Sequence, residues 1–281
     1  MEKERKTYTD ALTRLAKGTD AGLYRLVPER VEIVNSDETL IQVLQECRET
    51  KKPVTFKAGG TSLSGQTITN SVLIEIGPDY GHAQILDEGQ RVKLPCSITG
   101  EAANRLLQPY GRKLGPQPAS IKSAKIGGIV ANNSSGSSYG ITYNSYHTIE
   151  SMRFILADGT TIDTASAESR QAFSQSHASL LSELRRLREE ILSDDKVRER
   201  IRHKFELKNT CGYGMNSFLD HEDPIDILAH LMIGSEGTLG FISEVVFKTV
   251  PNDPLKASAL IYFPDLKEAC KAIGPLRQCS K

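Results

Sequence analysis

The stretch that decides the fold is AGGTSLSGQT, Ala58–Thr67, which lies between two segments with the composition of strands. Glycines at 59, 60 and 65 allow the backbone to approach a ligand closely, because they carry no Cβ. Their amides, together with the hydroxyls of Ser62 and Ser64, can form a cluster of donors for phosphate oxygens. A structural turn rich in glycine would have the same composition. The stretch therefore predicts either a phosphate-binding loop or a turn.

Two common nucleotide-binding patterns do not fit this loop. Gly60-x4-Gly65-Gln66-Thr67 is close to a Walker A sequence, but Gln66 stands where the phosphate-binding lysine belongs. The segment that follows, ITNSVLIEI, has the pattern of a strand, whereas a P-loop must open a helix. The chain also contains no GxGxxG sequence. An NTPase site and a Rossmann dinucleotide site are both disfavoured.

Strands and helices alternate around the loop. VEIV (31–34), PVTFKA (53–58), VLIEI (72–76) and RVKLPC (91–96) predict strands. One helix is expected to begin at Ser36 or Asp37 and to carry Leu40, Ile41, Leu44 and Cys47 on one face, and Thr99 is expected to open another. We expect an α/β subdomain over about residues 27–115, preceded by an N-terminal helical arm over residues 1–26.

A long polar segment follows, GPQPASIKSAKIGGIVANNSSGSSYG, Gly115–Gly140. Its apolar residues, such as Ile126 and Ile129, favour an ordered structure over a disordered loop. Gly127 and Gly128 permit close approach of the backbone, and the run Asn132–Ser135 offers donors and acceptors for a polar ring edge or a chain of hydroxyls. Clusters of serine and asparagine are also common in plain loops.

The rest of the chain predicts a second subdomain, over about residues 116–253. SMRFILADGTTID (151–163) has the pattern of a hairpin that turns at Asp158-Gly159. A long helix should present Leu180, Leu184, Leu187 and Ile191 on one face. IGSEGTLGFISEV (233–245) places three glycines around Glu236 and runs into a strand. This carboxylate could cap a helix or accept a hydrogen bond from a ligand.

The last residues predict a strand, KASALIYF (256–263), and then a helix that starts at Pro264-Asp265. A lone strand and helix cannot bury both faces, so the pair either opens a further domain or packs onto the main body. We expect the former. Residues 254–281 would then be the beginning of a truncated substrate or cap domain, and the chain a fragment.

Composition excludes several classes of function. The 281 residues include 35 basic and 35 acidic side chains, so no basic surface for nucleic acid is expected. No apolar run approaches the roughly 20 residues of a membrane span, and the N-terminus is too polar for a secretory signal. Five scattered cysteines without a CxxC pair, and histidines without HExxH spacing, predict reduced thiols in a cytoplasmic protein and no metal site.

Four segments in this order resemble the FAD-binding domain of the vanillyl-alcohol oxidase/p-cresol methylhydroxylase type, in its D-2-hydroxyacid dehydrogenase branch. The GGTS-type pyrophosphate loop of that family matches Gly59–Gly65, and its IGG…N…G segment matches Ile126–Gly136. LADG matches Leu156–Gly159, and GSEGTLG matches Gly234–Gly240 without a mismatch. The resemblance covers roughly Val27–Val250, and four ordered motifs are more specific than any one of them.

The resemblance implies an α+β fold in which two subdomains clasp FAD, with the start of an α/β cap domain after them. The implied cofactor-binding residues are Ala58, Gly59, Gly60, Thr61, Ser62, Leu63, Ser64, Gly65, Pro118, Ala124, Ile126, Gly127, Gly128, Asn132, Asn133, Ser134, Ser135, Glu236, Gly237, Gly240 and Ile242. Where a relative links its flavin through a histidine in the first loop, this sequence has Thr61. FAD is therefore expected to bind without a covalent bond at this loop.

The activity that the resemblance implies is oxidation of a small D-2-hydroxy acid, such as D-lactate or glycolate, by hydride transfer to flavin and then to another electron acceptor. The family's substrate-binding and catalytic residues would lie mostly beyond Lys281, so none is assigned here. Residues 9–25, TDALTRLAKGTDAGLYR, further resemble large bacterial members with a C-terminal iron–sulfur region. Two alternatives stay open: a flavin-dependent reductase of nucleotide-sugar precursors of peptidoglycan, and a non-catalytic module that binds an anion or a partner.

Overall fold

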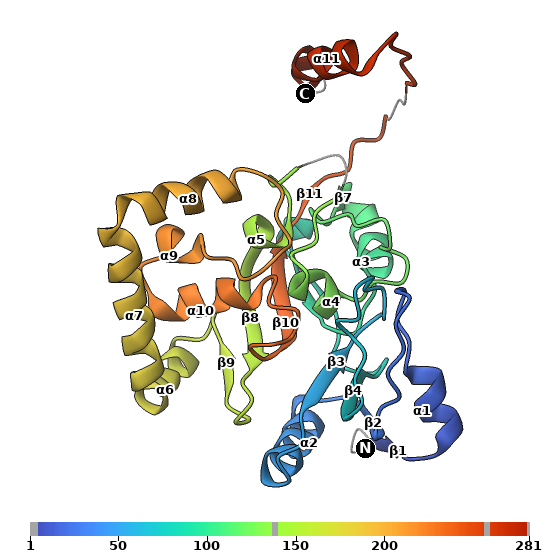
Figure 1. Ribbon diagram of the computed structural model, residues 1–281, viewed down its shortest axis with the longest axis vertical. Coiled ribbons are helices and arrows are strands. Elements are labelled where there is room, and N and C mark those ends of the chain that lie inside the picture. Colours follow the sequence, from blue (N-terminus) through green and yellow to red (C-terminus); the bar gives the residue numbers. More distant parts are fainter. Residues whose placement is uncertain (1–4, 137–139, 256–258, 280–281) are drawn as a thin grey trace.

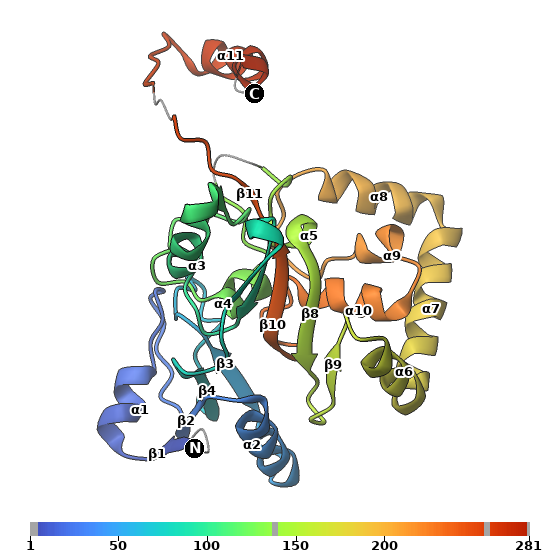
Figure 2. The same cartoon turned by 180° about the vertical axis from the view of Figure 1, so that it is seen from behind.

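The structure is a computed structural model that describes residues 5–136, 140–255 and 259–279. Its described part has an α+β architecture built on two main sheets, one of four strands and one of five. Figures 1 and 2 show the smaller sheet beside α1 and α2, and the larger sheet beside the helices α6–α10. The glycine-rich segments lie between these two parts.

The smaller sheet has the strand order β1-β2-β4-β3. Its strands are β1 (Lys6–Tyr8), β2 (Arg30–Val34), β3 (Val54–Lys57) and β4 (Val72–Ile76), and only β1 is antiparallel to its neighbour. Helix α2 (Asp37–Glu49) packs on the sheet through Leu40, Val43, Leu44 and Cys47. Ser36 caps this helix in a capping box with Thr39. The strands and the helix start predicted for this part are confirmed.

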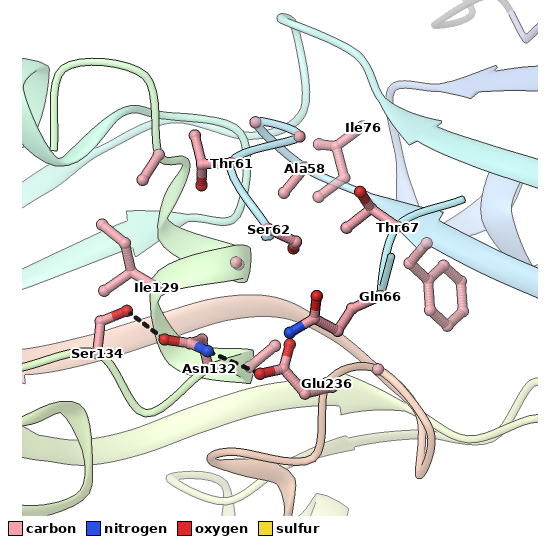
Figure 3. A pocket seen from close by; sticks show the side chains of 18 of the residues that line it. Ala58, Thr61, Ser62, Gln66, Thr67, Ile76, Ile129, Asn132, Ser134 and Glu236 are labelled. Carbon is pink, nitrogen blue, oxygen red and sulfur yellow. Dashed lines mark hydrogen bonds between the residues drawn. The ribbon is translucent and has the colours of Figure 1, made fainter. Parts of the chain in front are cut away.

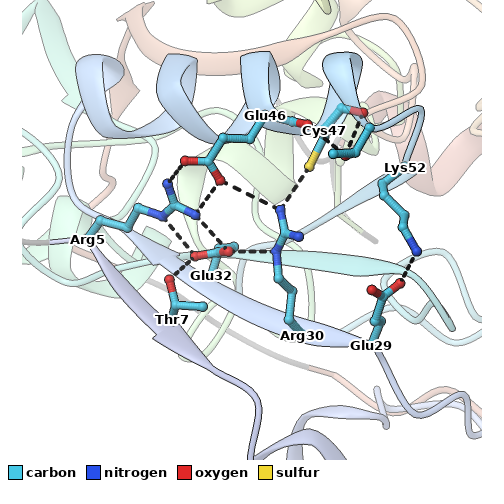
Figure 4. A network of polar contacts seen from close by, with 9 residues as sticks. Arg5, Thr7, Glu29, Arg30, Glu32, Glu46, Cys47 and Lys52 are labelled. Atoms are coloured by element: carbon cyan, nitrogen blue, oxygen red, sulfur yellow. Dashed lines mark hydrogen bonds and ion pairs between the residues drawn. The ribbon is translucent and has the colours of Figure 1, made fainter.

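The N-terminal arm differs from the prediction, because β1 adds a strand to the smaller sheet before helix α1 (Ala11–Lys17) begins. Figure 4 shows what holds β1 in place: Arg5 donates two hydrogen bonds of 2.9 Å to the fully buried carboxylate of Glu32 on β2, and Arg30 donates another of 2.8 Å. The Thr7 hydroxyl donates a further bond to Glu32 at 2.6 Å. A strand of three residues is too short to show a periodic pattern, so no sequence signal predicts it.

The larger sheet is antiparallel throughout and has the order β5-β6-β10-β8-β9. Its strands are β5 (Gln84–Leu86), β6 (Arg91–Pro95), β8 (Ile149–Ile155), β9 (Thr161–Asp163) and β10 (Phe241–Lys248). The predicted turn at Asp158-Gly159 joins β8 to β9, with Gly159 at a φ of +88°. Because β5 and β6 precede residue 115 and the other strands follow it, the sheets do not divide at that residue.

Helices cover the larger sheet and complete its core. They are α3 (Gly100–Leu107), α4 (Ile126–Ala131), α5 (Ser145–Thr148), α6 (Ala167–Ser176), α7 (Ala178–Ser193), α8 (Asp195–Phe205), α9 (Ser217–Asp220) and α10 (Pro224–Met232). Thr99 caps α3, as predicted. A small two-stranded sheet pairs β7 (Arg112–Lys113) with β11 (Val250–Pro251). The core of this part is separate from the core under α2, but Ile155 and Phe241 of the larger sheet reach into the latter.

The predicted strand near the C-terminus is wrong over residues 259–263, where the structure has no strand; residues 256–258 lie outside the described residues. Leu260 and Tyr262 are 79% and 84% exposed, so no neighbouring strand or core stabilises an extended conformation there. Helix α11 (Leu266–Cys279) follows and lies apart from the body in Figures 1 and 2. In the described ranges, no helix is long and apolar enough to cross a membrane.

Candidate functional site

A cleft of about 290 Å³ lies between the two parts of the molecule. Three segments line it: the end of β3 with the loop after it, the region around α4, and the approach to β10 (Figure 3). The lining residues are Phe56, Ala58, Gly59, Gly60, Thr61, Ser62, Leu63, Gln66, Thr67, Ile76, Pro118, Ser120, Ala124, Gly127, Gly128, Ile129, Ala131, Asn132, Ser134, Glu236, Gly237, Gly240, Phe241 and Ile242.

The loop Ala58–Thr67, called the glycine loop from here on, connects the parallel strands β3 and β4 without a helix. At Gly59 it touches the opposite wall of the cleft, because an ideal Cβ on this residue would lie only 2.3 Å from the carbonyl oxygen of Ser123. Gly60 has a φ of +64°, a conformation that favours glycine. In the described structure, the amides of residues 59–63 donate no hydrogen bond to protein. They are therefore available to a ligand.

Helix α4 forms the second wall and packs closely against the glycine loop. An ideal Cβ on Gly128 would lie 3.3 Å from the Cβ of Ala58, so a larger residue would push the loop away. The amides of Ile126 and Gly127 donate to the carbonyls of Ile98 and Cys96, at 2.8 and 3.1 Å. These contacts fix α4 on the larger sheet.

A polar group closes the end of the cleft near β10. The amide nitrogen of Asn132 donates to a carboxylate oxygen of Glu236 at 2.7 Å, and the Ser134 hydroxyl donates to the Asn132 side-chain oxygen at 3.1 Å (Figure 3). The Glu236 backbone has a φ of +53° and its amide donates to Ala131. Burial raises the pKa of Glu236, and the hydrogen bond from Asn132 opposes this shift. The site thus holds a carboxylate with a weakened preference for its charged form.

Most of the predicted cofactor-binding residues line the cleft, and they come from the glycine loop, from the stretch Pro118–Ser134 and from the stretch Glu236–Ile242. The exceptions are Ser64, Gly65, Ile126, Asn133 and Ser135. Ile126 is fully buried in the core beneath α4, and the side-chain oxygen of Asn133 accepts from the Tyr146 amide. The hydroxyl of Ser135 is buried without a partner in the described structure. Ile126 and Asn133 therefore support the walls of the cleft from behind.

Sequence reasoning missed several lining residues, namely Phe56, Gln66, Thr67, Ile76, Ser120, Ile129, Ala131 and Phe241. Gln66 and Thr67 belong to the glycine loop as quoted, so the motif itself could have identified them. The rings of Phe56 and Phe241 contact each other at a centroid distance of 5.2 Å and are tilted by 59°. They come from different sheets, and no local pattern indicates that contact.

The lining is suited to an anionic ligand with an apolar part. None of the described lining residues is a lysine, arginine or histidine, so backbone amides and hydroxyls are the donors that the cleft offers. The Thr67 hydroxyl is buried and has no protein partner among the described residues. No group of three potential metal ligands occurs within the described ranges. The residues therefore fit a diphosphate held by neutral donors, next to an aromatic and aliphatic surface.

Comparison with known proteins agrees with this chemistry. Residues 28–165 match the family described as "FAD binding domain". D-2-hydroxyglutarate dehydrogenase of Pantoea ananatis is 25% identical over 252 residues, which cover 87% of this chain and 24% of that protein. "D-lactate dehydrogenase [cytochrome] 1, mitochondrial" of Saccharomyces cerevisiae is 23% identical over 256 residues, which cover 89% of this chain and 35% of that protein.

Among solved structures, an alkyldihydroxyacetonephosphate synthase superposes with a TM-score of 0.62 at 19% identity, over 97% of this chain and 43% of that one. This likeness supports the α+β fold. The chain spans about a quarter of the Pantoea protein and about a third of the yeast protein. Residues 28–165 therefore match an FAD-binding domain, and FAD is the cofactor that this match and the relatives support.

Proposed function

We propose that this chain is the FAD-binding part of an oxidoreductase that oxidises a D-2-hydroxy acid by hydride transfer to the flavin. The observation that carries the proposal is the cleft between the two sheets, whose described lining offers free amides and hydroxyls and no cationic side chain. Two relatives named for D-2-hydroxyglutarate and D-lactate support the substrate class. FAD, when bound, supplies the acceptor for the hydride.

The glycine loop would hold the diphosphate of FAD. Amides of Gly59–Leu63 and the Thr67 hydroxyl can donate to phosphate oxygens without a lysine or a metal. Asn132, Ser134 and Glu236 would bind polar atoms of the ribityl chain or of the ring edge. The position after the paired glycines is Thr61, which has no imidazole to form a flavin bond, so we propose that FAD binds non-covalently.

Residues 27–253 would form the FAD-binding domain, and residues 254–281 would lead into a substrate domain. The support for this division is that residues 259–263 are exposed and that α11 lies apart from the body (Figure 1). A hydroxy acid also needs a cation to pair with its carboxylate, and the described cleft lining contains none. An electron acceptor or iron–sulfur region in a longer protein, and a cytoplasmic location, stay predictions; one relative is named as mitochondrial.

The test is to purify the chain, load it with FAD and measure dye reduction with D-lactate, glycolate and D-2-hydroxyglutarate. We expect saturable FAD binding and no hydroxy acid-dependent dye reduction, because the cleft lacks a partner for the substrate carboxylate. A longer protein that contains this chain should bleach the flavin with a D-2-hydroxy acid and not with its L-enantiomer. If nucleotide sugars alter the flavin spectrum and hydroxy acids do not, the proposed substrate class is wrong.

A further inference from the structure

The N-terminal arm passes over the outer side of the glycine loop, on the way from β1 to β2. Its first part is fixed by Arg5, which binds Glu32 on β2 and Glu46 on α2 (Figure 4). Further along, the Arg14 side chain donates to the Pro28 carbonyl at 2.6 Å. This contact spans the segment Lys17–Leu26, which is called the brace from here on. It has a constrained path on the surface of the smaller sheet.

Lys57 connects the brace to the glycine loop. It is the last residue of β3, directly before the loop, and its ammonium donates to the carbonyls of Lys17 at 2.9 Å and Thr19 at 2.5 Å. An ideal Cβ on Gly60 would lie 3.0 Å from Cε of Lys57, so the lysine side chain packs behind the loop. Lys57 does not line the cleft. It therefore joins two backbone segments from the side opposite the ligand.

The tip of the brace touches the loop a second time. An isolated bridge between Thr19 and Arg25, and a hydrogen bond of 3.1 Å from the Leu26 amide to Gly18, close the brace into a hairpin. An ideal Cβ on Gly22 would lie 2.6 Å from the Leu63 carbonyl oxygen. At this point only a residue without a side chain allows the two backbones to approach so closely.

Two carboxylates, that of Glu75 and that of Asp20 in the brace, act electrostatically on the Lys57 ammonium, and among the described residues neither forms an ion pair with it. Glu75 on β4 lies close enough to stabilise the charge but pairs directly with Lys17, at 2.7 Å. Burial lowers the pKa of Lys57, because removing the ammonium from water disfavours its charged form. Keeping the charge in this position therefore costs folding free energy. The two carbonyl contacts at the end of α1 offset part of that cost.

We propose that the brace holds the glycine loop in the conformation that binds the diphosphate of FAD, with Lys57 as a positioning residue. The inference deepens the proposed function and rests on it. A loop with glycines at 59, 60 and 65 has many accessible backbone conformations when free, and ordering them on binding would weaken affinity. Contacts at two points of the loop, Gly60 and Leu63, restrict these conformations before FAD arrives.

The test compares Lys57→Met with the matched control Lys52→Met, whose lysine pairs only with the exposed carboxylate of Glu29 among the described residues. FAD affinity is measured by flavin fluorescence, and ADP and riboflavin are used as competitors. We expect Lys57→Met to weaken FAD and ADP by about tenfold, because both carry the diphosphate, and to leave riboflavin unchanged. Lys52→Met should match the wild type for all three.

A second variant keeps the inference testable if Lys57→Met does not fold. Gly22→Ala would displace the brace tip from Leu63 and should weaken FAD and ADP in the same ratio. Equal affinities in wild type and both variants, or equal losses for FAD and riboflavin, would overturn the inference and leave the FAD site intact. If the wild type itself does not bind FAD, the proposed function is the part that fails.

Discussion

Replacing Gly59 by alanine probes the closest contact between the two walls of the cleft. The new Cβ would lie 2.3 Å from the Ser123 carbonyl oxygen, 3.2 Å from its carbon and 3.3 Å from Cα of Ala124. All three are backbone atoms, so no side-chain rotation can relieve the overlap. An ordinary contact begins at 3.4 Å, and the walls must therefore separate by roughly 1 Å. Such overpacking costs about 1–3 kcal/mol of folding stability.

The same displacement moves the loop amides away from the diphosphate. Loss of one hydrogen bond to a charged group costs about 2 kcal/mol, which corresponds to an affinity for FAD about 30-fold weaker. Fluorescence titration measures this affinity, and thermal unfolding of the FAD-free protein measures stability. The control is Gly274→Ala, where a Cβ would meet nothing within 4 Å. A Gly59→Ala protein with both the affinity and the melting temperature of the wild type would refute the close contact.

Three further predictions concern charges. Because burial raises the pKa of Glu236, its protonated form contributes folding stability below about pH 4.5, and this contribution is lost as pH rises through the folded-state pKa. Glu236→Gln, which stays neutral, should therefore raise the Tm at pH 7 and leave it unchanged at pH 4. Burial lowers the pKa of His230 to about 4, and unfolding curves should show a loss of up to about 3 kcal/mol as pH falls from about 6.5 to 4, which His230→Gln removes. Glu32→Gln should cost about 3 kcal/mol in urea unfolding, since it leaves Arg5 and Arg30 without a buried carboxylate, whereas the exposed Glu29→Gln should not shift the midpoint.

Local signals in the sequence predicted much of the fold. Ser36 and Thr99 are N-cap residues, and their hydrogen bonds involve neighbours three positions away, so the sequence alone identifies them. The turn at Asp158-Gly159 is local for the same reason. The glycine loop was also found, because glycines between two strands mark a close approach of the backbone.

Features that depend on distant contacts were not predictable. Strand β1 is held in the sheet by hydrogen bonds from Arg5 to the buried carboxylate of Glu32, 27 positions away. A strand of three residues is too short to show a periodic pattern of apolar side chains. KASALIYF has the composition of a strand, but its described part has no neighbour to pair with. The aromatic contact between Phe56 and Phe241 joins two sheets, and the sequence contains no sign of it. Local patterns therefore predicted the site as separate segments, and only the family resemblance placed these segments around one cofactor.

The central claim is that the glycine loop and the opposite wall bind FAD through amides and hydroxyls, without a cationic side chain of the described lining and without a metal. The most direct measurement is a titration of the purified chain with FAD in the presence of EDTA, followed by flavin absorbance and fluorescence. We predict saturable binding at one site per chain, with the flavin released intact on heating. A protein that stays colourless and leaves the fluorescence of added FAD unchanged would contradict the account.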